Sequence, residues 1–235
     1  MSIAIAIIVT AVLLFFVYAS YSIGFGYYVK SICTMESNEK VVAITFDDGP
    51  CNHTTPKVLE VLTRHNIEAA FFLIGKNFEQ NFEIARQIEK EGHLIGIHSY
   101  GHESAFPFYS KARMVGEMNK CISLLGQLGS RYNKIYFRPP FGVTNPNIAS
   151  AIKETGAVSV GWNIRSMDTT LDLGKQGERK NSIDKIMNRL APGSIILLHD
   201  RLEHSHTLLE ELITSIHSAG YKIIRFDKAT ENGNN

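Results

Sequence analysis

Two adjacent carboxylates, Asp47 and Asp48, follow an apolar run and precede Gly49 and Pro50. An Asp-Gly-Pro sequence is good turn chemistry, but a turn needs only one aspartate. Two charged groups at the end of a buried segment are costly to desolvate unless something uses them. The pair therefore indicates a chemical role at this position.

A second polar group, His98 and His102, follows the apolar residues 94–97. Two imidazoles separated by three residues can face one metal ion from a single turn. Alone, such a pair is also typical of ordinary loop or core histidines. Combined with the aspartates it predicts two imidazoles and one carboxylate around an ion, which leaves open positions as catalytic sites do.

Arg138 and His199 also follow apolar segments. Two prolines directly after Arg138 hold it stiffly, and its guanidinium could steady a carboxylate base through paired hydrogen bonds. His199 is a candidate general acid, because imidazole titrates near neutrality. The competing interpretations are a surface ion pair for Arg138 and a buried structural histidine for His199.

These residues must be positioned by the elements that precede them. Helical patterns over 56–65, 111–128 and 208–219 lie between the apolar runs. This alternation predicts a parallel α/β sheet, open or closed into a barrel. Functional side chains of such folds gather beyond the carboxyl ends of the strands, so we expect the four polar groups to meet there. The expected strands are 41–46, 69–74, 94–97, 135–137, 158–162, 194–199 and 221–226.

The N-terminal residues 1–30 differ from the rest of the chain. No charged side chain occurs between residues 2 and 29, and a bilayer core needs about 20 apolar residues in a helix. Tyrosines crowd its C-terminal half, as they do at membrane interfaces. We predict an uncleaved transmembrane signal anchor over 1–30 and a linker over 31–39. A cleaved signal peptide is the alternative, with Ala19-Ser20 as a weak cleavage site.

We infer the orientation of this anchor from function rather than from charge. Lys30 and Lys40 flank its C-terminal side, and the positive-inside rule taken literally would place that side in the cytoplasm. We expect the opposite, with the domain outside, on functional grounds. The domain is expected over 40–228, with a flexible tail at 229–235.

Composition restricts the partners. The chain has 235 residues and a formal net charge of +1, without a basic run. Nucleic-acid binding needs clustered cations, so we expect no nucleic-acid partner. The charge balance leaves a neutral sugar open as substrate. Three widely spaced cysteines imply no disulfide framework, and the sequence specifies no oligomeric state.

The ordered set of polar groups resembles the polysaccharide deacetylase family, also called the NodB-homology domain or carbohydrate esterase family four. The resemblance covers residues 40–226 and implies a distorted (β/α) barrel of about seven parallel strands behind the N-terminal transmembrane helix. The segments that carry it are TFDDG at 45–49, HSYGH at 98–102, RPPF at 138–141 and LLH at 197–199.

The resemblance also implies a metal centre. Asp48, His98 and His102 would hold a divalent ion; Zn²⁺ is expected, with Co²⁺ or another ion as the alternative. Asp47 would be the general base that takes a proton from the metal-bound water. Ser99 would support a metal ligand from the second layer of contacts.

Further roles carry over from the family. Arg138 would orient Asp47, and His199 would protonate the leaving amine. The backbone N–H of Phe141 would stabilise the tetrahedral oxyanion. Leu197 is assigned to the substrate pocket.

The fourth family motif is altered in this chain. The family usually has Asp-x-x-Asp-Trp, and this chain has Arg165, Asp168 and Thr169 at those three positions. The retained Asp168 is assigned to orient His199. The missing tryptophan normally helps wall the acetyl pocket, and Trp162, Leu197 or another side chain could replace it.

We therefore predict a hydrolase of amide bonds that removes N-acetyl groups from an amino-sugar polymer, such as peptidoglycan or a chitin-like chain, and releases acetate. Its localisation would be membrane-anchored, with the catalytic domain outside the cytoplasm. Two alternatives stay open. One is a carbohydrate-binding module without turnover, and the other is a deacylase of O-acetyl or non-sugar amide substrates, which the same metal chemistry would serve.

Overall fold

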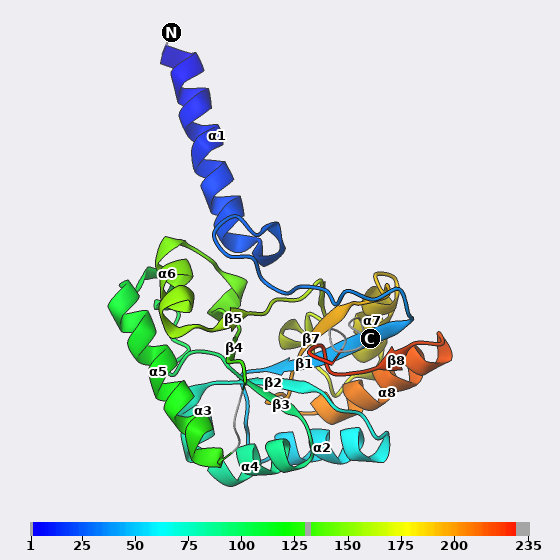
Figure 1. Ribbon diagram of the computed structural model, residues 1–235. Helices are drawn as coiled ribbons and strands as arrows, with labels where there is room; N and C mark the ends of the chain where they lie inside the picture. The colour runs from blue at the N-terminus through cyan, green and yellow to red at the C-terminus, as the bar shows by residue number, and fades with distance from the viewer. Residues whose placement is uncertain (1, 130–132, 229–235) are drawn as a thin grey trace.

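The computed structural model describes residues 2–129 and 133–228, and Figure 1 shows an α/β domain from which one long helix projects. The tail expected at 229–235 lies outside the described residues. The fold confirms the α/β distorted barrel expected from the sequence. It is a half-barrel, since seven strands form one continuous path and the two ends of that path are not paired with each other in the described residues.

The sheet is parallel throughout its named strands, in the order β5-β4-β3-β2-β1-β7-β6. An eighth strand, β8, pairs in parallel with the start of β1. The strands are β1 Val41–Asp47, β2 Ala70–Leu73, β3 Leu94–Ile97, β4 Tyr136–Phe137, β5 Val158–Ser159, β6 Ile164–Arg165, β7 Ile195–His199 and β8 Lys222–Ile223.

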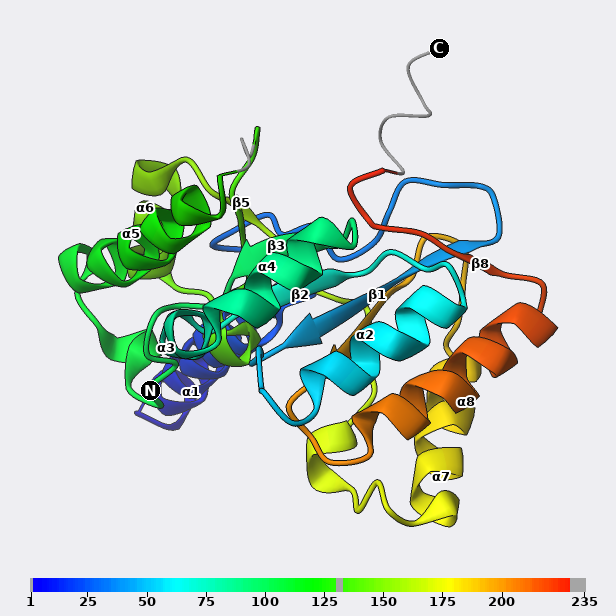
Figure 2. The ribbon, with the colours of Figure 1, turned by 90° about the horizontal axis from the view of Figure 1, so that it is seen from below.

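Helices cover the outside of this sheet, as Figure 2 shows from below. Within the described residues, four short 3₁₀ helices lie in the loops: η1 Ile23–Phe25, η2 Phe106–Phe108, η3 Pro140–Gly142 and η4 Asp168–Thr170. The outer helices are α2 Thr55–Arg64, α3 Gly75–Gln80, α4 Phe82–Lys90, α5 Lys111–Leu128, α6 Pro146–Thr155, α7 Gln176–Met187 and α8 Ser205–Ser218.

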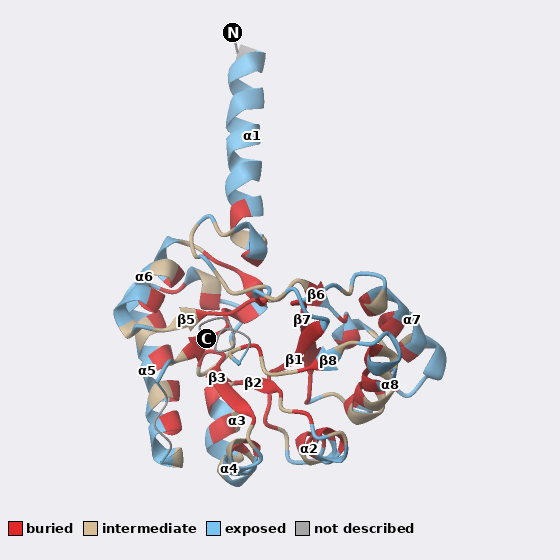
Figure 3. Cartoon of the chain, turned by 45° about the vertical axis from the view of Figure 1, so that its right-hand side comes forward, coloured by how far each residue is buried: buried red, intermediate tan, exposed pale blue. Residues whose placement is uncertain are grey.

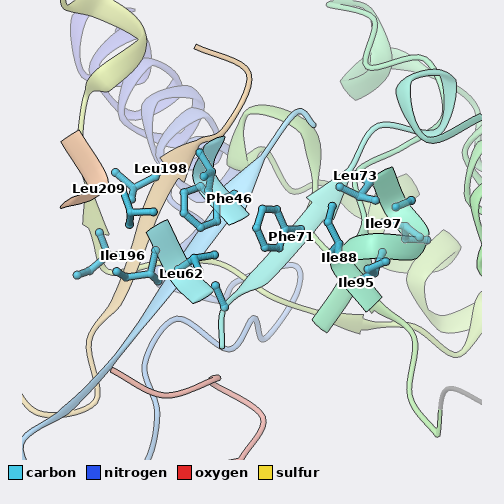
Figure 4. Close-up of a cluster of buried hydrophobic side chains, with 14 of the residues drawn as sticks. Phe46, Leu62, Phe71, Leu73, Ile88, Ile95, Ile97, Ile196, Leu198 and Leu209 are labelled. Atoms are coloured by element: carbon cyan, nitrogen blue, oxygen red, sulfur yellow. The ribbon is translucent and has the colours of Figure 1, made fainter. Parts of the chain in front are cut away.

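The core explains why the central strands are nearly continuous in apolar residues. All seven residues of β1 are buried, because both of its faces are covered. Its alternate residues enter two different clusters, Ile44 and Phe46 toward the helices and Ala43 toward the barrel interior. In Figure 4 the ring of Phe46 stacks on Phe71 between the sheet and the helices, with ring centroids 4.8 Å apart. This packing fixes the strand ends that carry the polar residues.

Two expected strands differ in extent. The run 158–162 forms a strand only at Val158–Ser159, and the separate strand β6, Ile164–Arg165, was not predicted. Only one of its two residues is buried, so β6 has no apolar pattern to reveal it. The run 221–226 is reduced to Lys222–Ile223, since only these residues reach the edge of β1.

The N-terminal helix α1, Ser2–Tyr21, is the one helix in the described chain that is long and apolar enough to cross a membrane by length and composition. Figure 3 shows it exposed along its length, with a buried patch where it meets the domain. That patch is Ala19, which is 0% exposed. The residues that follow do not leave the domain, because Ile32 and Thr34 form isolated bridges with Val160 and Ser194.

Candidate active site

The predicted polar residues lie together beyond the carboxyl ends of the strands. Asp47 ends β1 and is paired in register with His199, which ends β7. His98 directly follows β3, and Arg138 directly follows β4. Parallel strands place these ends at one edge of the sheet, so residues far apart in the chain meet there.

The backbone at this edge adopts uncommon conformations. Several of the residues have left-handed φ angles, among them Asp48 at 74°, His102 at 48° and Phe141 at 61°. Such values are uncommon for residues other than glycine and concentrate at functional sites. Ser99, with φ 59°, accepts a hydrogen bond on its hydroxyl from the His102 N–H at 3.0 Å. The bond closes the turn that brings His102 back toward His98.

Asp48, His98 and His102 form the metal-binding candidate. One ligand atom from each lies within 4.8 Å of the others, and each imidazole Nε2 is 3.6 Å from Asp48 Oδ1. His98 Nδ1 donates to the Arg138 carbonyl oxygen at 2.7 Å, which leaves Nε2 as the ligand atom. Burial, reinforced by His98, lowers the pKa of His102 to about 4. A neutral imidazole can bind a metal, so this donor set fits a divalent ion.

The second aspartate is held by a fully buried arginine. Arg138 Nη1 donates to Asp47 Oδ1 at 2.6 Å and to the Thr45 hydroxyl at 2.8 Å. Its Nε and Nη2 donate to the carbonyl oxygens of Val160 at 3.3 Å and Gly161 at 2.8 Å. Arg138 is 0% exposed, so these acceptors replace the water that a buried guanidinium would otherwise require. Asp47 is thereby fixed beside the metal-binding candidate, with Oδ2 3.9 Å from His98 Nε2.

His199 is held from the opposite side by Asp168. The His199 Nδ1–H donates to Asp168 Oδ1 at 2.8 Å, and the backbone N–H of His199 donates to Oδ2 at 2.8 Å. Burial lowers the pKa of His199, but the Asp168 hydrogen bond and the neighbouring carboxylates outweigh it, so the net pKa is raised. His199 Nε2 faces the site, 3.9 Å from Asp48 Oδ2. This arrangement suits a proton donor with a fixed tautomer.

One further residue of the site belongs to none of the predicted polar groups. Arg201 Nε donates to Asp48 Oδ2 at 2.9 Å, while Asp48 Oδ1 faces the two imidazoles. Burial raises the pKa of Asp48. His98, the hydrogen bond from Arg201 and the other histidines lower that pKa by more, so the net pKa of Asp48 is lowered. The only signal in the sequence is the position of Arg201, two residues after His199.

The altered fourth motif leaves its new side chains outside the site's interior. Arg165 and Thr169 are exposed, whereas the retained Asp168 is buried. Trp162 lies behind Gly142, where a Cβ would be 2.6 Å from its ring. Leu197 is buried in β7.

An exposed aromatic ring borders the metal-binding candidate. Phe141 is 48% exposed, and its ring centroid is 4.8 Å from that of His102. The structure thus places Phe141 beside the metal-binding candidate.

The chain is similar in sequence to proteins of known families. Residues 34–160 match the family model described as polysaccharide deacetylase. The peptidoglycan-N-acetylmuramic acid deacetylase PdaA of Bacillus subtilis is 28% identical over 191 residues, which cover 81% of this chain and 72% of that protein. A peptidoglycan-N-acetylglucosamine deacetylase of Bacillus cereus is 32% identical over 195 residues, 80% of this chain and 67% of that protein.

The same relationship appears in three dimensions. The structure of Bacillus subtilis PdaA, a family 4 carbohydrate esterase, has a TM-score of 0.73 and 26% sequence identity to this chain. The alignment covers 86% of this chain and 85% of that one. The likeness therefore extends over the half-barrel as a whole.

Proposed function

The chain belongs to the polysaccharide deacetylase family, and on that premise we propose that it removes N-acetyl groups from an amino-sugar polymer of the peptidoglycan type. The observation that carries this proposal is the convergence of Asp47, the metal-binding candidate and His199 at one edge of the sheet. A base, a metal centre and an acid around one point are what amide hydrolysis needs. A binding module would need none of them.

The metal would be held by Asp48, His98 and His102, and we propose Zn²⁺, with Co²⁺ as the alternative. When bound, such an ion polarises the acetamide carbonyl and lowers the pKa of a coordinated water. Ser99 supports this centre through its bond to the His102 N–H.

Asp47 then acts as the general base. It takes a proton from the attacking water as the new C–O bond forms on the acetyl carbon. Arg138 keeps the Asp47 carboxylate in place and compensates its charge throughout. We assign the backbone N–H of Phe141 to the oxyanion and Leu197 to the wall of the acetyl pocket.

His199 completes the reaction as the general acid. Its proton passes to the sugar nitrogen as the C–N bond breaks, which releases acetate and a free amino sugar. Asp168 holds the Nδ1–H and thereby directs Nε2 to the leaving group.

The location of the substrate follows from the proposed chemistry. Peptidoglycan lies outside the cytoplasmic membrane, so we place the domain over 40–228 on that side, with α1 as its membrane anchor or signal segment. Relatives named for N-acetylmuramic acid and for N-acetylglucosamine are both similar to this chain. We propose an N-acetylated glycan and leave the acetylated sugar to experiment.

The proposal is tested by measuring the acetate that the purified protein, held in micelles, releases from its substrates. The protein is stripped of metal, given Zn²⁺ or Co²⁺, and supplied with peptidoglycan, an N-acetylglucosamine oligomer or an O-acetylated glycan. We expect metal-dependent release from an N-acetylated substrate. Release only from the O-acetylated glycan would move the activity to esters, and metal binding without any release would favour a binding module.

A further inference from the structure

Residues 19–35, here called the N-terminal strap, join the base of α1 to the half-barrel. The strap crosses from the end of β5 to the start of β7, two strands that the sheet order separates. Near its C-terminal end the Ile32 N–H donates to the Ser159 carbonyl oxygen at 2.9 Å, and the Gly161 N–H donates to the Ile32 carbonyl oxygen at 2.8 Å. At its end the Met35 N–H donates to the Gly193 carbonyl oxygen at 2.8 Å.

The strap is packed as closely as it is hydrogen-bonded. A Cβ at Gly161 would lie 2.6 Å from Cys33 Sγ and 3.2 Å from Ile23 Cδ1. A Cβ at Gly193 would lie 2.2 Å from the Met35 carbonyl oxygen. A side chain at Gly193 would collide with the strap backbone, and one at Gly161 would displace the side chains of Cys33 and Ile23.

The segment pinned by the strap is the one that holds Arg138. The carbonyl oxygens of Val160 and Gly161 accept two of the hydrogen bonds from the Arg138 guanidinium. Nη1 of the same guanidinium donates a hydrogen bond to Asp47. A continuous line of direct contacts thus runs from Ile32 through Gly161 and Arg138 to the proposed base.

The other end of the strap touches a second loop of the site. Thr144 donates its N–H to the Ser20 carbonyl oxygen at 2.9 Å. It follows the η3 turn at Phe141 and Gly142, which borders the metal-binding residues. Ser20 belongs to the last turn of α1, so helix and loop meet without any spacer between them.

We propose that the N-terminal strap is a positioning element of the active site: it fixes the Val160–Gly161 backbone, which fixes Arg138 and through it Asp47. The inference rests on the proposed role of Asp47 as base. Most of the strap precedes residue 34, where the match to the family model begins, so the motifs themselves do not contain it. It also means that α1 and the active site form one rigid unit rather than two parts joined by a free linker.

The test uses the full-length protein in micelles with Zn²⁺. Ile32→Pro removes the N–H that bonds to Ser159, and Ile23→Ala removes the contact with Gly161; Ile32→Val keeps both the N–H and the shape. Lys30→Ala changes an exposed strap residue and serves as the matched control. We expect kcat for deacetylation to fall about tenfold in the first two variants, as displaced catalytic groups do, with KM within about twofold.

A second readout separates positioning from loss of fold. Trp162 is the sole tryptophan and directly follows Gly161, so its fluorescence reports on the pinned segment. Acrylamide quenching of Trp162 should increase in Ile23→Ala and Ile32→Pro, and stay at the wild-type value in Ile32→Val and Lys30→Ala. Ile23→Ala carries the test if Ile32→Pro does not fold.

The outcomes are distinct. The inference would be overturned if Ile23→Ala and Ile32→Pro kept the wild-type kcat despite increased quenching. Unchanged quenching of Trp162 in these variants would also overturn it. An inactive wild-type protein with metal bound would contradict the proposed function instead, and quenching would still decide whether the strap pins the Gly161 segment.

Discussion

The two sides of the site are built differently. On the base side, Asp47 ends the seven-residue buried strand β1 and is braced by the fully buried Arg138, and the residues of the metal-binding candidate follow β1 and β3. On the acid side, Asp168 begins the short helix η4 shortly after the two-residue strand β6, and it holds His199. The match to the family model, residues 34–160, covers the base side and ends before the acid side.

This contrast shows where the chain can vary. Removing a partner from a buried ion pair is strongly destabilising, because it leaves an uncompensated charge. The Arg138–Asp47 pair is of this kind, so the base side tolerates little change. The acid side replaces two motif residues by Arg165 and Thr169, both of which are exposed. It keeps only the Asp168–His199 contact, which the proposed reaction requires.

The largest effect is expected from His98→Ala, because it removes both a proposed metal ligand and the bond to the Arg138 carbonyl. Acetate release should fall by more than about 10³-fold, since the proposed chemistry depends on the ion. Zinc content after dialysis should fall with it. Activity that persists without bound zinc would contradict the proposed dependence of the reaction on the ion.

Asp47→Asn is expected to be next. The amide keeps the size of the carboxylate but cannot accept the proton, so kcat should fall about 10³-fold. Bound zinc should stay at the wild-type level, because the variant leaves all three proposed ligands in place. Equal losses of zinc and activity, measured per folded molecule, would instead make Asp47 a metal ligand.

His199→Ala separates the two sides through the leaving group. We expect kcat on an N-acetylated oligomer to fall about 10²-fold, because the amine leaves poorly without a proton. On 4-nitrophenyl acetate, whose leaving group needs no proton, the loss should be within about threefold. Asp47→Asn should lose activity on both substrates, and a similar pattern for the two variants would erase the distinction between the sides.

Asp168→Asn should give a smaller loss of the same kind. The amide cannot accept both the Nδ1–H and the backbone N–H of His199 as the carboxylate does. We expect kcat on the oligomer to fall about 30-fold through misorientation of the acid. The ester substrate should again be spared. Full activity on the oligomer would show that His199 is oriented without Asp168.

The smallest effect is expected from Arg201→Gln. Its bond to Asp48 Oδ2 leaves Oδ1 directed at the imidazoles, so its loss should weaken zinc binding about tenfold. Competition with a chromogenic chelator measures this affinity, and kcat at saturating zinc should stay near wild type. Arg86→Gln, which breaks an exposed pair with Glu83, is the control. Equal zinc affinities in Arg201→Gln and Arg86→Gln would show that Arg201 does not contribute to the metal-binding candidate.

The order of residues along the chain is enough to predict the fold class and the residues of the proposed centre. Apolar runs alternating with helical patterns predict a parallel α/β fold, and each polar group follows such a run. Asp47, His98, Arg138 and His199 are therefore expected at one edge of the sheet from their positions in the sequence. These are local signals, since a strand and the residue that follows it are neighbours in the chain.

Contacts between distant segments depend on the tertiary structure. The strap pairs Ser31 with Ser159, 128 residues apart, in a segment whose short length and partly polar composition are typical of a linker. Arg201 reaches Asp48 across 153 residues, and β6 is too short to have a period. Such contacts depend on how the strands and loops pack against one another. They join segments far apart in the chain, so no local sequence pattern predicts them.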